Sequence, residues 1–151
     1  IPDSCTSIGT SSFAGCKNLS SVSFGKSVSV IGMFAFQGCK SLTSISLPKT
    51  LESLGDWVFY NCSGLKSVYL GTSITDIGSG AFENCTGLIT VFLPKSLSVI
   101  KPESYDTNPF TGCSGMLDFY SDAPQSNDIW ERYFGRVSYG VSYDEYLKLA
   151  Q

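Results

Sequence analysis

The sequence of 151 residues contains no histidine, and this absence excludes much of the usual catalytic chemistry. Without histidine, a serine or cysteine nucleophile lacks the imidazole base of the common catalytic triads. Histidine is also the commonest protein ligand of metals, and the carboxylates of this chain are sparse and scattered. We therefore predict that the protein is not an enzyme, and that it has no catalytic residues, no metal site and no cofactor.

Charge and long apolar runs are scarce as well. Charged residues make up 15% of the sequence and the formal net charge is −3, so no broad basic surface is expected. Nucleic acid is therefore not an expected partner. No run of 18 apolar residues is present, so direct membrane insertion is not expected either. The chain shows no basic-then-apolar leader, so its composition leaves the localisation open.

The sequence does contain a repeat with a period of 23 residues. The pattern Ile-Gly-x-x-x-Phe-x-x-Cys-x-x-Leu-x-x-Val-x-Leu recurs, and its cysteines follow that period at Cys16, Cys39, Cys62 and Cys85. Strict repeats of this length form solenoids, in which a turn buries its apolar side chains only by stacking on its neighbours. In the second turn the apolar positions are Ile31, Phe36, Cys39, Leu42, Ile45, Leu47 and Leu51.

Each turn is predicted to contain one short parallel strand. Apolar residues alternate in the segments 22–24, 45–47 and 68–70, and a period of two with β-branched residues is typical of strands. A glycine or proline follows each segment and ends the strand. The Phe-x-x-Cys arm on the opposite side of the turn is predicted to be a short helical or 3₁₀ turn.

The six cysteines are predicted to be free, although their number is even. Equivalent residues of stacked turns lie about 4.8 Å apart with parallel side chains. A disulfide requires Cβ atoms about 3.8 Å apart that point toward each other. Five of the cysteines should therefore form a ladder of buried thiols that act as small apolar side chains, and Cys5 should replace an aliphatic core residue in another column.

The fuller pattern Ile-Gly-x-x-Ala-Phe-x-x-Cys-x-x-Leu-x-x-Ile-x-Leu-Pro, found almost unchanged in residues 31–48 and 77–94, resembles the BspA-like leucine-rich repeat. The resemblance covers residues 1 to about 121. It implies a right-handed solenoid of the α/β superhelix type, with the strands on its concave side and no catalytic residues. Such proteins are typically exposed on the cell surface or secreted, and members with known roles act in adhesion.

The repeat is predicted to form one unit and the remaining residues another. Residues 1–121 form the solenoid, with an incomplete first repeat and five extra residues in the fifth turn. Residues 122–151 leave the period and are predicted to form a cap over the last turn. Because Ile1 falls where other turns end a strand, further repeats or domains are expected before it.

Three elements are predicted within this cap. Residues 127–134 fit a short helix, and residues 136–141 fit a strand. Ser142 and Glu145 have the spacing of a capping box, which would open a final helix ending at Leu149.

Side chains that alternate with the buried strand residues point out of the concave side. In the later turns, serines at these positions give way to aromatic residues on neighbouring strands, about 4.8 Å apart. Exposed aromatic side chains are frequent in binding hot spots. The first candidate binding patch therefore consists of Tyr69, Phe92 and Tyr120, with Lys66, Ile89 and Leu117 beside them at the start of each strand. The alternative is that residues 122–151 fold over these rings, or that the rings only pack on one another.

A second candidate is an apolar strip on the outer side of the turns, formed by Phe34, Trp57 and Tyr60. Phe34 and Trp57 occupy the same position of successive turns, and at that position other turns have the small residues Ser11 and Gly80. The alternative is that these rings pack against a neighbouring turn.

Together these features predict a non-catalytic protein-interaction module of a cell-surface or secreted protein. Its expected partner is an extracellular-matrix protein or another macromolecule of a host or neighbouring cell. Two alternatives remain open: a structural spacer that displays another domain, and a glycan-binding module whose concave aromatic rings stack on sugars.

Overall fold

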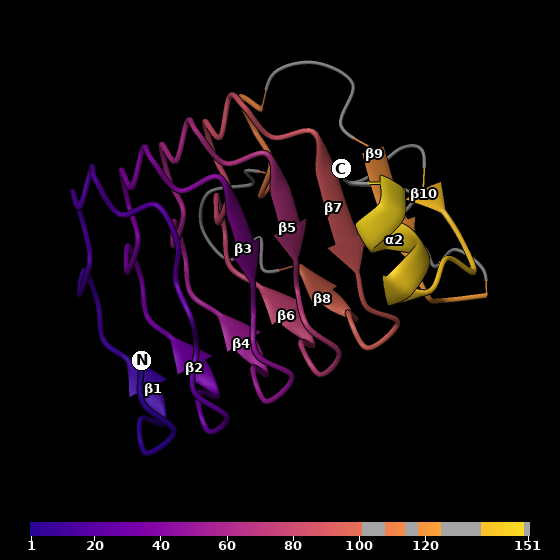
Figure 1. Ribbon diagram of the computed structural model, residues 1–151, viewed down its shortest axis with the longest axis horizontal. Coiled ribbons are helices and arrows are strands. Elements are labelled where there is room, and N and C mark those ends of the chain that lie inside the picture. The colour runs from indigo at the N-terminus through magenta and orange to yellow at the C-terminus, as the bar shows by residue number, and fades with distance from the viewer. Residues whose placement is uncertain (101–107, 114–117, 125–136, 150–151) are drawn as a thin grey trace.

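The computed structural model describes residues 1–100, 108–113, 118–124 and 137–149, and it shows a stack of similar turns with parallel sheets along two of its sides (Figure 1). The β1 sheet has the order β1-β2-β4-β6-β8, and the β3 sheet has the order β10-β9-β7-β5-β3. The strands of the β1 sheet are β1 (Ser7–Ile8), β2 (Val30–Ile31), β4 (Ser53–Leu54), β6 (Asp76–Ile77) and β8 (Val99–Ile100). Those of the β3 sheet are β3 (Ser44–Ser46), β5 (Ser67–Tyr69), β7 (Thr90–Leu93), β9 (Asp118–Ser121) and β10 (Val137–Ser138).

The register of both sheets follows the sequence repeat. Ser44 pairs with Ser67, which lies 23 residues later, and the other pairs of the second to fourth turns have the same separation. Across β7 and β9, Thr90 pairs with Asp118, which lies 28 residues later. The five extra residues therefore lie between these strands without interrupting the ladder.

The structure has two strands in most turns, whereas one was predicted. The strands of the β1 sheet are two residues long, and in the first three of them one side chain points to the core while the other is exposed or half-buried. An alternation that spans only two residues has no period to detect, so the sequence pattern did not reveal this sheet.

The strand predicted at residues 22–24 is wrong, because residues 20–25 form no strand. Val22 and Phe24 are only half-buried. This turn has fewer stacked neighbours than the turns after it, so less burial is gained from holding it in register. Among the described residues, β3 is therefore the edge strand of its sheet on the side of the first turn, and β10 is the edge strand at the other end.

The Phe-x-x-Cys arm forms turns rather than the predicted helical or 3₁₀ segment. In the second turn, the N–H groups of Phe34, Phe36 and Gly38 donate hydrogen bonds to the next turn, and those of Gln37 and Cys39 donate three residues back. A 3₁₀ helix needs consecutive bonds of the second kind. The residue before the cysteine of each Phe-x-x-Cys arm has a positive φ, which explains why it is glycine or asparagine; these residues are Gly15, Gly38, Asn61, Asn84 and Gly112.

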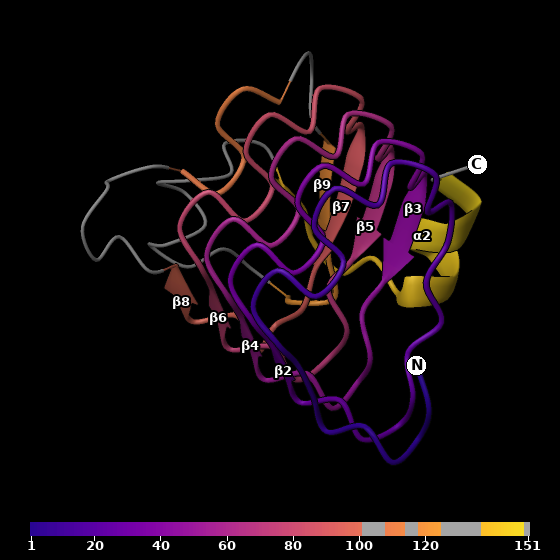
Figure 2. The same cartoon turned by 90° about the vertical axis from the view of Figure 1, so that its left-hand side faces the viewer.

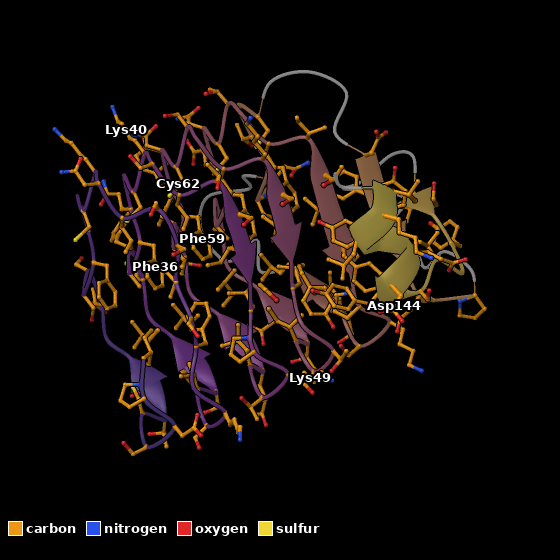
Figure 3. The ribbon with its side chains drawn as sticks, viewed as in Figure 1. Phe36, Lys40, Lys49, Phe59, Cys62 and Asp144 are labelled. Atoms are coloured by element: carbon orange, nitrogen blue, oxygen red, sulfur yellow. The ribbon has the colours of Figure 1, made fainter. Side chains whose placement is uncertain are left out.

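The core contains a column of phenylalanine rings, one from each turn (Figure 3). The ring of Phe59 lies 5.4 Å from that of Phe36 and 5.3 Å from that of Phe82, and the three rings are nearly parallel. All three side chains are fully buried. Stacked rings at this separation contribute about 0.5–1.5 kcal/mol per pair beyond the burial of their area.

Five of the cysteines form a second column, Cys5 lies outside it, and all six are free, as predicted. Cys39, Cys62 and Cys85 are fully buried, whereas Cys16 in the first turn is exposed. The thiol of Cys62 donates a hydrogen bond to the carbonyl oxygen of Phe36 at 3.1 Å, and the other buried cysteines repeat this contact with the preceding turn. The thiols therefore satisfy backbone carbonyl groups, in addition to filling space.

These buried thiols should make the fold sensitive to alkaline pH. Burial raises the pKa of Cys62 to about 12, from an ordinary value of 9.0, and also raises the pKa of Cys85. A thiol is neutral when protonated, so above pH 9 the unfolded chain loses protons that the folded chain retains. The free energy of unfolding then falls by about 1.4 kcal/mol per pH unit for each thiol. Urea denaturation should show nearly constant stability from pH 6 to 8 and a steep loss between pH 9 and 11.

The matched control is the double variant Cys62→Ala with Cys85→Ala. It should be less stable than the wild-type chain at pH 7 but should lose stability less steeply above pH 9. An equal slope in both proteins would show that other groups, such as the buried tyrosines, cause the alkaline loss.

The end of the chain lies against the β3 sheet. Strand β10 pairs with β9, and helix α2 (Tyr143–Leu149) lies on the sheet face directed away from the core (Figure 2). The predicted capping box is confirmed, because the carboxylate of Glu145 accepts a hydrogen bond from the Ser142 N–H at 2.8 Å, and the Ser142 hydroxyl accepts one from the Glu145 N–H. The predicted helix at 127–134 lies outside the described residues, and the division at residue 121 stays a prediction.

Candidate binding surfaces

The predicted concave patch is brought together by the β3 sheet. Tyr69, Phe92 and Tyr120 are ladder partners on β5, β7 and β9, and the rings of Tyr69 and Phe92 lie 5.4 Å apart. These rings are not open to solvent, since Tyr69 is 6% exposed, Phe92 is 1% exposed and Tyr120 is half-buried. The arrangement matches the alternative in which residues 122–151 fold over the rings. A role of this patch in binding stays a prediction.

Two tyrosines of α2 cover the patch. The ring of Tyr143 lies 3.9 Å from that of Tyr69, and the ring of Tyr146 lies 5.3 Å from that of Phe92. Tyr146 also contacts Tyr120 at 5.9 Å between ring centres. The capping box in the sequence predicts the helix but not these contacts. Their spacing of three residues on one helix face was the only signal in the sequence.

The hydroxyl group of Tyr146 is anchored in the sheet. It donates a hydrogen bond to the backbone carbonyl of Val68 at 3.1 Å and lies 3.4 Å from the hydroxyl of Thr90. Tyr146 is 2% exposed, and this burial raises the pKa of its phenol group. The site therefore accommodates the polar end of the tyrosine as well as its ring.

The residues beside the patch remain accessible. Lys66 is exposed and Ile89 is 52% exposed, and the N–H of Ile89 donates to the carbonyl of Lys66 at 2.9 Å. Leu117, the third residue predicted there, lies outside the described residues.

A groove of about 420 Å³ remains open between the first turns and α2. Its lining includes Ser23, Ser46, Lys49, Tyr69 and Tyr143. The serines and the lysine supply polar groups that a sugar could use. The ring of Tyr69, however, is almost fully covered by Tyr143 and Phe92, so little aromatic surface is left on which a sugar could stack.

The outer strip is partly assembled as predicted. The rings of Phe34 and Trp57 stack at 5.6 Å with an interplanar angle of 14°, and both side chains are half-buried. The indole N–H of Trp57 donates to the carboxylate of Glu83 at 3.0 Å. Tyr60 is half-buried and has no ring partner among the residues that the structure describes. The two stacked rings therefore pack on neighbouring turns and still present a surface.

Both residues of this pair adopt a strained backbone conformation. Their φ angles are positive, 57° for Phe34 and 50° for Trp57, as are those of Ser11 and Gly80 at the equivalent positions. A side chain with a Cβ atom is disfavoured in this region by about 1–2 kcal/mol. The sequence gives no direct sign of this strain, because it depends on how the arm turns.

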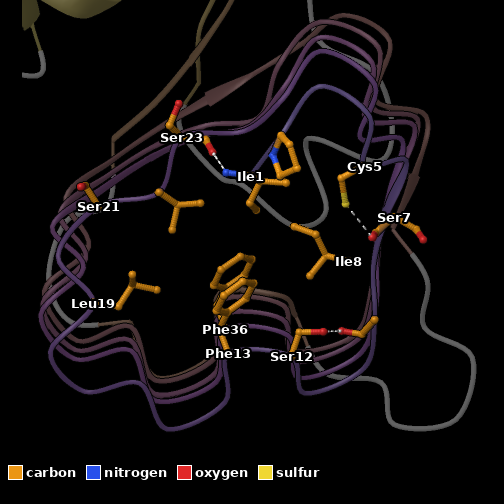
Figure 4. A pocket seen from close by; sticks show the side chains of 13 residues that line it. Ile1, Cys5, Ser7, Ile8, Ser12, Phe13, Leu19, Ser21, Ser23 and Phe36 are labelled. Atoms are coloured by element: carbon orange, nitrogen blue, oxygen red, sulfur yellow. Dashed lines mark hydrogen bonds between the residues drawn. The ribbon is translucent and has the colours of Figure 1, made fainter.

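A larger pocket of about 520 Å³ opens at the first turn (Figure 4). Ile1, Ile8, Phe13, Leu19 and Phe36 line it. These residues belong to the same apolar columns that form the core in later turns, so the pocket is the end of the core rather than a separately built site.

The helix that the structure describes is too short to cross a membrane.

Comparison with known proteins identifies the repeat. The family model described as the BspA type leucine rich repeat region matches residues 1–116 in six copies. Among solved structures, a leucine-rich repeat protein from Treponema pallidum is 29% identical, with a TM-score of 0.64, and the match covers 76% of this chain and 51% of that protein. A leucine-rich repeat protein from Bacteroides ovatus is 33% identical with a TM-score of 0.63, and the match covers 77% of this chain and 28% of that one.

A leucine rich cell surface protein from Faecalibacterium prausnitzii matches over 97% of this chain and 33% of its own length, with 28% identity and a TM-score of 0.68. The matches therefore span only about a third to a half of these three proteins. No curated protein matches the sequence.

Proposed function

Because the chain belongs to the BspA-type leucine-rich repeat family, we propose that it is a non-catalytic protein-binding module of a cell-surface or secreted protein. Leucine-rich repeats generally mediate protein binding, which supports the first part of this proposal. The similarity to a protein described as a cell surface protein supports the proposed location. We propose adhesion to an extracellular-matrix protein or to another surface protein of a host or neighbouring cell.

The observation that carries this proposal is the stacked pair Phe34 and Trp57. Their stacking contributes about 0.5–1.5 kcal/mol, whereas the positive φ of each residue costs about 1–2 kcal/mol. Stacking alone therefore does not offset the backbone strain, and the rings are only half-buried, so part of their surface is accessible. The same positive φ recurs at Ser11 and Gly80 and so belongs to the repeat, but the second and third turns differ in placing a large ring at this position. We propose that this pair is the contact surface for the partner protein.

The test replaces both rings by the small residue of the first turn, in the double variant Phe34→Ser with Trp57→Ser. Binding to a panel of purified extracellular-matrix proteins, measured by surface plasmon resonance, should weaken at least tenfold for any protein that the wild-type chain binds. The melting temperature should fall by only a few degrees, because the lost stacking contributes about 0.5–1.5 kcal/mol and serine already adopts this backbone conformation at Ser11. Val30→Ser, which removes an exposed apolar side chain from β2, should leave binding unchanged.

Two results would contradict the proposal. Unchanged binding together with a large loss of stability would show that the rings serve only to pack the turns. A wild-type chain that binds no protein of the panel would favour the spacer function.

A further inference from the structure

We infer that the outward face of the β3 sheet is a docking site for a short helix with tyrosines three residues apart, and that α2 fills this site in cis. The inference concerns a different surface from the outer strip and does not depend on it. Three observations support it: the contact of α2 with the sheet is separate from the core, its two tyrosines have specific partners there, and the helix has few other attachments.

The contact between α2 and the sheet is separate from the core. Tyr69, Phe92 and Tyr146 form a buried cluster of their own, with Tyr120, Val141 and Tyr143 packed around it. The strands lie between this cluster and the main core, so the cluster can open without exposing the stacked phenylalanine rings. The docking of α2 is therefore a contact between two surfaces rather than a part of the core.

Helix α2 has few other attachments. It is seven residues long, and Tyr146 is its only buried residue. Leu147 and Leu149 are 42% and 56% exposed, so the two leucines of the helix do not attach it to the sheet. An isolated helix of this length is unstable in water. The sheet must therefore supply the free energy that keeps it helical, as a groove does for a bound helical peptide.

The site distinguishes tyrosine from other apolar residues. Two hydrogen-bonding groups, the carbonyl of Val68 and the hydroxyl of Thr90, face the phenol oxygen of Tyr146. Among the described residues, no buried side-chain oxygen or nitrogen lacks a partner, so this polar end is fully accommodated. A phenylalanine in this place would leave Thr90, itself buried, with one partner fewer. The second ring, Tyr143, is selected by its close contact with Tyr69.

An external partner must compete with α2 for this site. A short connection from β10 keeps α2 close to the sheet, and such a tether corresponds to an effective concentration in the millimolar range. A helix from another protein therefore gains access only if it binds more tightly than the untethered α2 would, or if α2 is displaced first. In the structure α2 covers this face, but the aromatic rings and hydrogen-bonding groups beneath it are those of a recognition site.

The test uses the full chain and a synthetic peptide with the sequence of residues 142–151. In the double variant Tyr143→Ala with Tyr146→Ala, α2 should leave the sheet, and the labelled peptide should bind saturably, as followed by fluorescence anisotropy. The wild-type chain should bind the peptide at least tenfold more weakly because its site is filled. A peptide carrying Tyr146→Phe should bind several-fold more weakly than the unchanged peptide, and one carrying Tyr146→Ala should not bind.

The matched control is Leu147→Ala with Leu149→Ala, which changes the exposed side of the same helix. This variant should behave like the wild-type chain. Failure of the folded tyrosine variant to bind the peptide, or equal binding by the wild-type chain, would overturn the inference.

Two further measurements cover the remaining outcomes. If the tyrosine variant does not fold, amide hydrogen exchange of the wild-type chain decides: α2 should exchange faster than β5 and β7, and equal protection would overturn the inference. Sedimentation of the wild-type chain should show a monomer. A concentration-dependent dimer that dissociates in the tyrosine variant would place α2 on a second copy and would overturn docking in cis.

Discussion

Replacement of Phe59 by alanine is expected to lower the free energy of unfolding by about 3–5 kcal/mol, as measured by urea denaturation. Phe59 is fully buried in the middle of the phenylalanine column and stacks on a ring in each neighbouring turn. The substitution leaves a cavity and removes the ring that stacks between Phe36 and Phe82. The backbone of each turn is held to its neighbours on both sides, so the cavity cannot collapse easily.

The matched control is Phe13→Ala, at the equivalent position of the first turn. Phe13 is half-buried and stacks on Phe36 alone, at 5.1 Å. Less apolar area is lost and solvent can enter the site, so the destabilisation should be less than half of that for Phe59→Ala. Equal losses in the two variants would show that the cost arises from the residue type and not from its place in the stack.

Replacement of Gly78 by alanine is expected to cost about 3 kcal/mol or more, although only one methyl group is added. A Cβ atom at Gly78 would lie 2.5 Å from the carbonyl carbon of Gly55 and 2.6 Å from the backbone nitrogen of Asp56. Overpacking against movable side chains costs about 1–3 kcal/mol. Here the obstacle is the backbone of the preceding turn, which is held by the hydrogen bond from Gly78 N–H to the Leu54 carbonyl at 2.8 Å.

Gly9 provides the comparison, because it occupies the same place in the first turn. A Cβ atom at Gly9 would meet only the hydroxyl of Ser12, at 3.4 Å. The Gly9→Ala variant should therefore be neutral, or more stable by about 0.4–1 kcal/mol through its effect on the unfolded chain. Thermal melting of both variants tests this, and a destabilised Gly9→Ala would mean that the glycine is required by backbone conformation rather than by close stacking.

The arrangement of the core could be predicted because it depends on the repeat. Once Cys62 and Cys85 are known to be equivalent, stacking places them in one column and prevents a disulfide, and the structure agrees. The final helix could be predicted from Ser142 and Glu145, since a capping box involves only residues close in sequence. In both cases the deciding interaction recurs with the repeat or is local.

The candidate surfaces were less accessible to prediction. The sequence places Tyr69 and Phe92 side by side, and the structure confirms that they are in contact. Whether solvent reaches them depends on Tyr146, which lies far along the chain and belongs to a segment without the repeat. A contact between non-equivalent segments has no periodic signal, so no sequence pattern could show that the rings are covered.

The sequence by itself determined the stacking of turns, the apolar columns, the free thiols and the capped final helix. These features follow from periodicity and from hydrogen bonds between residues close in sequence. Only the tertiary structure decided that most turns carry a second strand, that Phe34 and Trp57 have a strained backbone, and that α2 covers the aromatic patch. The second strand and the strained backbone depend on the angles at which the chain bends within a turn. The cover over the aromatic patch depends on where the chain goes after it leaves the repeat. The physical reason is that the spacing of apolar residues encodes neither the bend angles within a turn nor a contact between unlike segments such as α2 and the β3 sheet.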